Sequence, residues 1–169
     1  MAIEPIEIVV EIPRGSRNKY EYDKERGIFV LDRVLYSSVH YPTDYGYVTE
    51  TLAEDGDALD ALVVVYEPTF PGCHIVSRPV GVLDMKDEKG PDQKILAIPL
   101  GDPRFQSIHD IGHLDPHWLR EIENFFQTYK ALEDKWTEVV GWEDAAVAER
   151  VVRSARELYR RGVEASYLP

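Results

Sequence analysis

Apolar residues recur in short runs over the first two-thirds of the chain, and these runs predict β-strands. Residues 6–12 alternate in part between apolar and polar and stop at Pro13, whereas residues 19–23 (KYEYD) alternate strictly. Alternation places every second side chain on the same face of a strand, so Lys19 and Glu21 share one face. The same signals predict further strands at residues 28–33, 62–65, 75–83, 95–100 and 136–142. Several short strands with Gly and Pro between them favour a small barrel.

Two stretches with helical periodicity follow the strands. Asp115 and Pro116 are typical of an N-cap and a first helical position. The apolar face of this first helix is predicted to consist of Leu119, Ile122, Phe125, Phe126 and Tyr129. A second helix is predicted over about residues 143–161 and should end at Gly162. Its inward face is predicted to consist of Val147, Val151, Ala155 and Leu158. The pattern therefore predicts an α+β protein that is mainly β.

Length and composition fit a single globular domain that spans residues 1–169. The hydrophobic content of 44% and the charged content of 30% are typical of folded rather than disordered chains. The formal net charge of −12 argues against a general binder of nucleic acid or of anionic membranes. The same charge repels anionic substrates, so such a substrate would need local cations or a metal.

The compartment is inferred from the N-terminal residues and from the cysteine content. Residues 1–13 (MAIEPIEIVVEIP) lack a basic segment and carry acids within their apolar part, and no apolar stretch is long enough to span a membrane. Cys73 is the only cysteine, so no internal disulfide is possible. We therefore expect a cytoplasmic protein. No motif surrounds Cys73, so it is predicted to be a small buried apolar residue rather than a nucleophile.

The chemistry of the chain centres on residues 50–66 (ETLAEDGDALDALVVVY). This segment places Asp55, Asp57 and Asp60 within six positions, directly before an apolar run that is typical of a buried strand. Carboxylates held so close repel one another unless a cation neutralises them. Mg²⁺ prefers a few carboxylates together with phosphate and water. No Lys or Arg occurs from residue 34 to residue 77, which leaves the cluster without a local counter-charge.

The spacing alone leaves an ordinary acidic turn open, because Asp and Gly dominate turns. An EF-hand is excluded, because Leu59 and Asp60 stand where that loop requires a ligand and its Gly. Residues 84–94 are charged and are predicted to form a solvated loop, which would matter only if it met the acidic cluster in space.

Other residues with chemical potential are better explained by structure. His109, His113 and His117 have a spacing that suggests metal ligands, but Gly112 and Pro116 interrupt any helix that would align them. Structural or interface roles are favoured for these histidines. Core packing is favoured for Tyr47, because tyrosine rings are amphipathic.

Five motifs stand in one order and with matching gaps along the chain. They are EIPRGSRNKYEYD (11–23), LDRVLYSSVHYPTDYGYV (31–48), EDGDALDALV (54–63), DEKGPDQK (87–94) and FFQTYKALE (125–133). Together they resemble soluble inorganic pyrophosphatase of the first family, in its short prokaryotic form, over about residues 6–142. The resemblance implies a five-stranded closed barrel of the oligonucleotide/oligosaccharide-binding (OB) type, flanked by two helices. It also implies Mg²⁺-dependent hydrolysis of pyrophosphate to two phosphates, with several ions per site, and a homohexamer. The sequence does not decide whether Mn²⁺ or Zn²⁺ can replace Mg²⁺.

The resemblance also implies roles for individual residues. The implied metal ligands are Asp55, Asp57, Asp60, Asp87 and Asp92, with Glu21 as a further metal-associated carboxylate. Asp57 is also the implied general base for the attacking water, and Tyr45 is implied at the metal and water site. The implied phosphate-binding groups are Lys19, Arg33, Lys94, Tyr129 and Lys130. Glu11, Tyr41 and Glu88 match acidic and tyrosine positions of the same cavity.

This sequence departs from the family pattern at two places. Ala58 stands where the family usually carries Pro or another residue, which puts the tightness of the turn and the metal affinity in question. Asn124 and Thr128 stand where some relatives carry histidines that join subunits, so the contacts of the implied hexamer are not specified.

Two other functions compete with the enzyme. The first is a non-catalytic acidic barrel that binds divalent cations, which leaves unexplained why Lys19, Arg33, Lys94 and Lys130 stand as isolated cations among acids and tyrosines. The second is a nucleic-acid-binding barrel, which the fold alone permits. The acidic balance and the lack of a basic and aromatic strand face argue against it.

Overall fold

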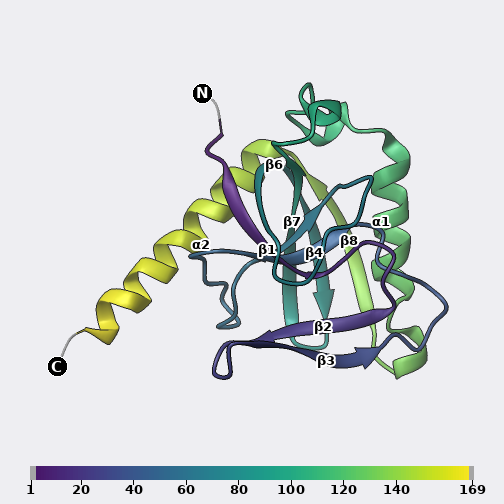
Figure 1. Ribbon diagram of the computed structural model, residues 1–169, viewed down its shortest axis with the longest axis horizontal. Helices are drawn as coiled ribbons and strands as arrows, with labels where there is room; N and C mark the ends of the chain where they lie inside the picture. The colour runs from purple at the N-terminus through teal and green to yellow at the C-terminus, as the bar shows by residue number, and fades with distance from the viewer. Residues whose placement is uncertain (1–2, 168–169) are drawn as a thin grey trace.

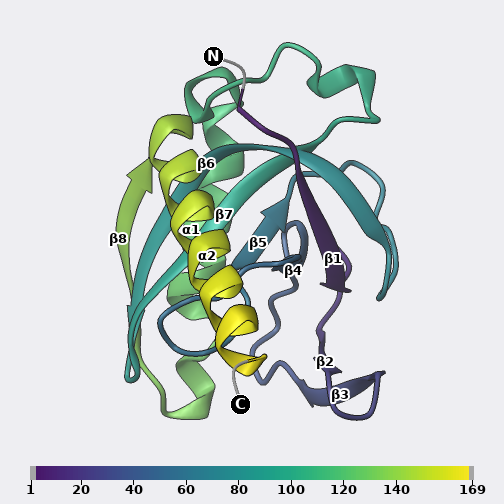
Figure 2. The same cartoon turned by 90° about the vertical axis from the view of Figure 1, so that its left-hand side faces the viewer.

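Five strands pair into a closed ring that forms the centre of the molecule. The computed structural model describes residues 3–167. The strands follow one another around the ring in the order β1 (Ile6–Ile12), β4 (Asp44–Val48), β5 (Asp60–Val63), β7 (Gly90–Pro99) and β6 (His74–Asp87). The ring closes because β6 pairs again with β1, and β8 (Thr137–Glu143) adds to the far half of β6. The arrangement can be followed in Figure 1 and, from the side, in Figure 2.

A separate hairpin lies at one end of the ring. It consists of β2 (Asn18–Asp23) and β3 (Ile28–Val34), which pair only with each other among the described strands. Figure 1 shows the hairpin running below the ring. The pairing sets Lys19 opposite Arg33, so two basic side chains from distant positions start from neighbouring backbone.

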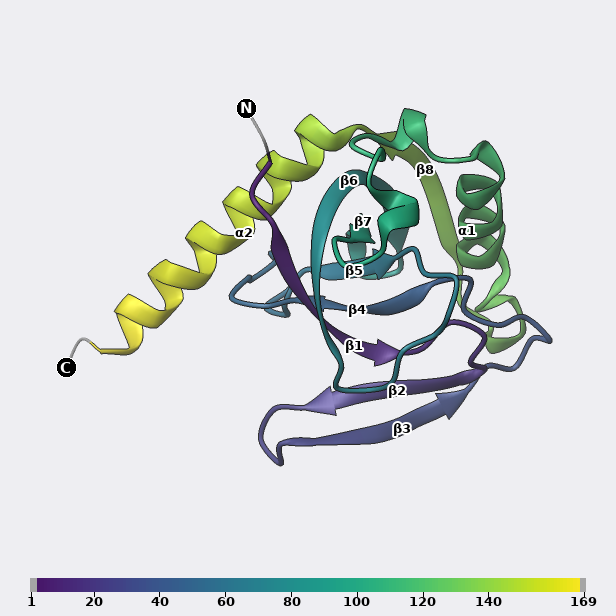
Figure 3. The same cartoon turned by 45° about the horizontal axis from the view of Figure 1, so that its top comes forward.

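Two long helices flank the ring on opposite sides, as Figures 1 and 3 show. Helix α1 (Pro116–Thr128) begins where the Asp115 side chain accepts a hydrogen bond from the His117 N–H, which confirms the predicted N-cap. Helix α2 is Ala145–Ser166, and Pro103–Phe105, Ile111–His113 and Ala131–Glu133 form short 3₁₀ turns. No helix in the described part of the chain has the length and apolarity needed to cross a membrane.

The apolar run at residues 62–65 is buried on both faces, and each face contacts a different helix. Leu62 and Val64 belong to a cluster that includes Phe125 and Phe126 of α1. Val63 and Val65 belong to a second cluster that includes Ala148 and Val152 of α2. Because side chains alternate along a strand, one central run joins both helices to the ring.

The predicted class, α+β and mainly β with two flanking helices, is confirmed. Three strand assignments differ from the prediction. The strand predicted at residues 62–65 is β5, which begins and ends two residues earlier, at Asp60 and Val63. Residues 44–48 form β4, which the Pro and Gly content of that region concealed. The charged residues 84–94, predicted as a loop, form the paired ends of β6 and β7, with a turn only at residues 88–89. Strand pairing satisfies the backbone groups of this charged stretch, whose side chains lie partly on the surface and partly toward the interior, as the burial of Lys94 shows.

The second helix differs from its prediction in its end and in its inward face. It passes through Gly162 and continues to Ser166, since a helical glycine costs only about 1 kcal/mol. Ala155 is buried as predicted, together with Ala145, Ala148 and Val152, whereas Val147 and Val151 are only partly buried and Leu158 is 39% exposed. Small alanine side chains let the helix lie close to β6, which decides the face that is buried. Cys73 is only half-buried, so the expectation of a buried thiol was wrong.

Candidate active site

A cavity of about 650 Å³ opens between the β2–β3 hairpin, the acidic segment before β5, the β6–β7 hairpin and the end of α1. It gathers side chains that lie far apart in the sequence. The expected site residues that line it are Glu11, Lys19, Glu21, Arg33, Tyr45, Asp55, Asp57, Asp60, Asp87, Glu88, Asp92, Lys94, Tyr129 and Lys130.

Tyr41 is the one expected site residue that does not line this cavity. It is 1% exposed and packs behind the wall, with ring centroids 5.4 Å from Tyr45 and 4.7 Å from Phe125. Its ring fills the space between the cavity wall and α1, so Tyr41 supports Tyr45 from behind. Tyr47, expected in the core, instead lines the cavity and stacks near Tyr22. Tyr45 and Tyr47 are two positions apart in β4, and strand alternation therefore turns both toward the same side.

The acidic cluster is built by a tight turn followed by a strand. The Asp57 N–H donates a hydrogen bond to Asp55 Oδ1 at 3.0 Å, and Gly56 between them has a φ of +88°. Such a φ favours glycine. Asp60 is the first residue of β5, where the parallel pairing with β7 places it beside Lys94.

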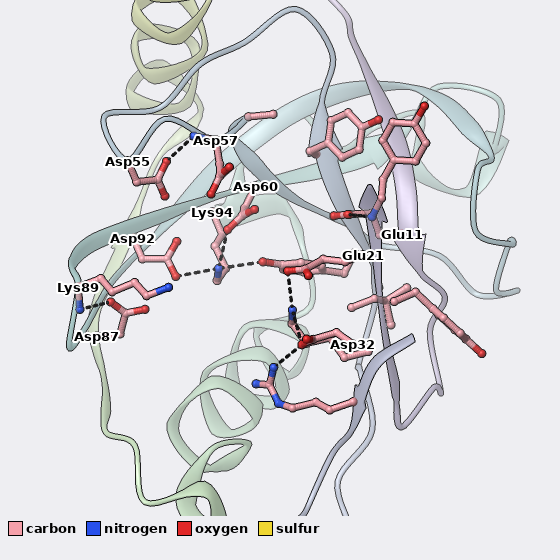
Figure 4. Close-up of a pocket in the computed structure, with 18 of the residues that line it drawn as sticks. Glu11, Glu21, Asp32, Asp55, Asp57, Asp60, Asp87, Lys89, Asp92 and Lys94 are labelled. Carbon is pink, nitrogen blue, oxygen red and sulfur yellow. Dashed lines mark hydrogen bonds and ion pairs between the residues drawn. The ribbon is translucent and has the colours of Figure 1, made fainter. Parts of the chain in front are cut away.

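Lys94 is the central cation of the site, as Figure 4 shows. Its side chain is 2% exposed, and its Nζ donates hydrogen bonds at 3.0 Å each to Asp60 Oδ2, Asp92 Oδ2 and Tyr45 Oη. Burial alone would lower the pKa of Lys94, but Asp60, Tyr45 and Asp92 outweigh that effect and hold the pKa well above its ordinary value. Lys94 is therefore a permanent positive charge between two carboxylates.

Several acidic groups are short of positive charge. Burial, and then repulsion from Asp60 and Asp87, raises the pKa of Asp92 in spite of the nearby Lys94. Burial raises the pKa of Glu11 to about 7, although its carboxylate accepts a hydrogen bond from the Tyr22 N–H at 2.8 Å. Carboxylates in this state favour the binding of a further cation.

The opposite wall holds basic side chains in place with acids of its own. Lys19 Nζ lies 3.2 Å from Glu21 Oε1 and 3.3 Å from Asp32 Oδ2. Arg33 lies 2.6 Å from Asp32 and 2.6 Å from Glu133. Burial opposes ionisation of Asp32, but Lys19 and Arg33 outweigh it and hold the pKa of Asp32 below its ordinary value. Asp32 thus keeps both cations at the edge of the cavity.

The end of α1 contributes Tyr129 and Lys130. Burial raises the pKa of Tyr129 to about 12, and burial also raises the pKa of Tyr45 well above its ordinary value. Both hydroxyls therefore stay protonated at neutral pH. Lys130 Nζ lies 4.0 Å from Asp87 Oδ2, and burial lowers the pKa of Lys130.

The donor set fits a hard divalent cation. Carboxylates from several different elements line one cavity, and oxygen is the ligand atom that Mg²⁺ prefers. Within residues 3–167 no three His, Cys, Asp or Glu side chains stand close enough to form a ready-made metal site. The Lys94 ammonium already lies between Asp60 and Asp92, which shows that this part of the cavity accommodates positive charge.

Some of the lining residues were not predicted from the sequence. These are Ile12, Tyr20, Tyr22, Lys24, Glu25, Asp32, Tyr47, Ala58, Lys89 and Lys135. Asp32 could have been found from the expected pairing of two adjacent strands, which sets Lys19 beside residues 31–33. The predicted break between the histidines is confirmed, since a 3₁₀ turn ends at His113 and α1 begins at Pro116.

Comparison with known proteins gives one consistent family. The family model described as inorganic pyrophosphatase matches residues 8–160. The inorganic pyrophosphatase of Methanosarcina mazei is 53% identical over 152 residues, which cover 90% of each chain. That of Halalkalibacterium halodurans is 53% identical over 162 residues, which cover 95% of this chain and 99% of the relative. Among solved structures, inorganic pyrophosphatase from Thermus thermophilus superposes with a TM-score of 0.91 at 46% identity, covering 93% of this chain and 92% of its own.

Proposed function

The chain belongs to the inorganic pyrophosphatase family and hydrolyses pyrophosphate to two orthophosphates, and we propose that it does so in the cavity around Lys94. The observation that carries this placement is the mixture of charges that line one cavity. Carboxylates that can hold metal ions face basic side chains that can hold phosphates, within about 650 Å³. A protein of net charge −12 can thereby bind a polyanion, because the cations are concentrated inside the cavity.

The proposed metal ion is Mg²⁺, with several ions per site and with Mn²⁺ or Zn²⁺ as substitutes. The residues that would hold it are Asp55, Asp57, Asp60, Asp87, Asp92 and Glu21. When bound, the ions would polarise phosphate oxygens and lower the pKa of water. Burial and repulsion from Asp60 raise the pKa of Asp92, and added positive charge would favour its carboxylate, which supports this assignment.

The proposed phosphate-binding groups are Lys19, Arg33, Lys94, Tyr129 and Lys130. They approach from different parts of the chain, so they can surround both phosphates of the substrate. Arginine and lysine neutralise the charge that develops on a leaving phosphate. Tyr129 stays protonated, so its hydroxyl can donate a hydrogen bond to a phosphate oxygen.

Asp57 is the proposed general base. It is exposed at the tip of the acidic turn and lines the cavity, so its carboxylate can accept a proton from the attacking water. The Tyr45 hydroxyl accepts a hydrogen bond from Lys94 and keeps its proton, so it can orient that water as a donor. Glu11 and Glu88 complete the acidic lining, and Tyr41 supports Tyr45.

The test measures phosphate release from pyrophosphate with Mg²⁺ and with an excess of chelator. We expect rapid release that the chelator abolishes. Asp57→Asn should lower kcat by about 100-fold or more with the fold unchanged, because it removes the base but keeps the shape of the side chain. Asp102→Asn is the matched control, since Asp102 caps a 3₁₀ turn outside the cavity. Asp57→Asn with wild-type kcat would refute the assignment of the base.

We extend the proposal to properties of the whole molecule. The closed ring of five strands supports a barrel of the OB type within a single domain of residues 1–169. Exposed apolar side chains such as Tyr36, Phe70 and Val76 support assembly, and we propose a homohexamer. The proposed location is the cytoplasm, with no nucleic-acid or membrane partner, which the net charge of −12 supports.

A further inference from the structure

The segment that carries Asp55 and Asp57 has space on both sides. One side faces the catalytic cavity. The other side faces a second cavity of about 330 Å³, which lies between the segment and α2. Asp55, Asp60 and Asp92 also line this second cavity. Residues 54–57 at the tip are exposed. Packing therefore fixes the tip weakly, and its position depends on hydrogen bonds at its base.

Thr51 joins the two ends of this segment through its side chain. Its Oγ1 donates a hydrogen bond to the Val48 carbonyl at 2.6 Å and accepts one from the Leu59 N–H at 3.0 Å. The residue is 4% exposed, so water does not replace these bonds easily. A backbone bond from the Val48 N–H to the Leu59 carbonyl at 2.8 Å lies beside them.

The base is also connected to the tip and to α2. The Leu52 N–H donates to the Ala155 carbonyl of α2 at 3.0 Å, across one end of the second cavity. The Ala53 N–H donates to the Asp57 carbonyl at 2.7 Å, which closes the turn around Gly56. The Leu59 N–H that Thr51 binds lies two residues along the backbone from Asp57, so the hydroxyl and the Ala53–Asp57 bond hold the same short segment.

We propose that Thr51 is a positioning residue that fixes Asp55 and Asp57 in the geometry that binds the divalent cation. This inference rests on the proposed function, in which both aspartates are metal ligands. The Thr51 hydroxyl is the side-chain group that bridges Val48 and Leu59, and without it the Leu59 N–H is buried and unpaired. Groups that hydrogen-bond directly to metal ligands typically change metal affinity by 10-fold to about 100-fold when they are removed, and Thr51 acts through the backbone, so we expect the lower end of that range.

The test compares Thr51→Val, which keeps the shape without the hydroxyl, with Thr51→Ser, which keeps the hydroxyl. Mg²⁺ binding is measured by titration calorimetry without substrate. We expect the valine variant to bind Mg²⁺ about tenfold more weakly and the serine variant to bind it within about twofold of the wild type. Wild-type affinity in a folded Thr51→Val variant would overturn the proposal, as would equal losses in both variants.

We call the two hydrogen bonds of the Thr51 hydroxyl, to Val48 and Leu59, the Thr51 clamp. Two controls distinguish a failure of this clamp from a failure of the proposed metal site. Ser77→Ala removes a buried hydroxyl ten residues from Asp87 along β6 and should leave Mg²⁺ affinity unchanged. Asp57→Asn should weaken Mg²⁺ binding if the carboxylate is a ligand. If Asp57→Asn has no effect, the proposed metal site is wrong; if it weakens binding and folded Thr51→Val does not, only the role of Thr51 is wrong.

Hydrogen exchange of the wild-type protein tests the same proposal if Thr51→Val does not fold. The Leu52 and Leu59 amides exchange with solvent when the segment opens at its base. If Mg²⁺ binds only the closed segment, it should slow the exchange of both amides by a factor that grows with its concentration and affinity. We expect saturating Mg²⁺ to slow both amides about tenfold or more. Unchanged exchange of these amides in the Mg²⁺-saturated protein would overturn the proposal.

Discussion

Replacing Lys94 with methionine should destabilise the protein when divalent ions are absent, and should destabilise it much less when they are present. Methionine keeps the apolar part of the side chain and removes the ammonium, which donates to Asp60, Asp92 and Tyr45 at 3.0 Å each. Two carboxylates then face each other without a counter-charge, and the Tyr45 hydroxyl loses a donor. The substitution thus isolates the electrostatic role of one buried charge.

The size of the effect follows from the burial of the partners. Removing one partner of a buried ion pair costs about 3–5 kcal/mol. The Asp60 and Asp92 side chains are 33% and 25% exposed, so water solvates them in part. We therefore expect a loss near the lower limit, about 3 kcal/mol of unfolding free energy in the presence of chelator.

Urea unfolding at neutral pH, followed with chelator and again with Mg²⁺, measures this loss. Mg²⁺ should reduce the deficit markedly, because Asp60 and Asp92 are proposed ligands and Lys94 no longer competes for them. Lys135→Met is the matched control, since Lys135 lines the same cavity but has no ion pair among residues 3–167. It should change stability by less than about 0.5 kcal/mol. A Lys94→Met protein as stable as the wild type in chelator, or a deficit that Mg²⁺ leaves unchanged, would contradict the electrostatic role of Lys94.

Two further predictions concern the fold around the cavity. Burial raises the pKa of Glu11 from 4.5 to about 7. Between these two pH values the folded chain holds a proton that the unfolded chain releases. The contribution of Glu11 to the free energy of unfolding is therefore full below pH 4.5 and is lost as pH rises through about 7. Glu11→Gln should remove this decline, which is about 3 kcal/mol at most. Urea unfolding with chelator across this pH range measures it, and an equal decline in the variant would refute the raised pKa of Glu11. Gly46→Ala should cost at least about 3 kcal/mol, since its Cβ would lie 1.9 Å from the Val9 carbonyl oxygen. Gly101→Ala is the control, because its Cβ meets nothing within 4 Å and the change should be nearly neutral. Thermal unfolding compares the two variants, and similar melting temperatures for both would count against the steric argument.

Much of the site was predictable because its main elements are local in sequence. Asp55, Asp57 and Asp60 lie within six positions, so a turn followed by a strand keeps them on one short segment of the chain. The N-cap at Asp115 and the apolar face of α1 likewise depend on neighbours a few residues away. The five motifs then added the family, and with it the roles that are now proposed for the lining residues.

The errors fall where the answer depends on contacts between distant segments. Tyr47 was expected in the core, but strand alternation turns Tyr45 and Tyr47 toward the same side of β4, which faces the cavity. Tyr41 is the buried one of the three tyrosines because it packs against α1. The charged stretch at 84–94 has loop composition, yet pairing along β6 and β7 makes it a hairpin. Helical periodicity found α2 and part of its inward face, but the close approach to β6 buries Ala145, Ala148 and Val152 more deeply than the predicted valines.

Residue order and local propensity were enough to specify the mainly-β class, the helix starts, the acidic turn and the family. The chain carries each of these features before it folds. Folding in three dimensions placed Lys94 between Asp60 and Asp92, joined Lys19 to Arg33 through Asp32, and set Thr51 as the clamp at the base of the acidic segment. These contacts depend on strand register and on the parallel pairing of β5 with β7, and register is fixed only when all the buried faces pack together.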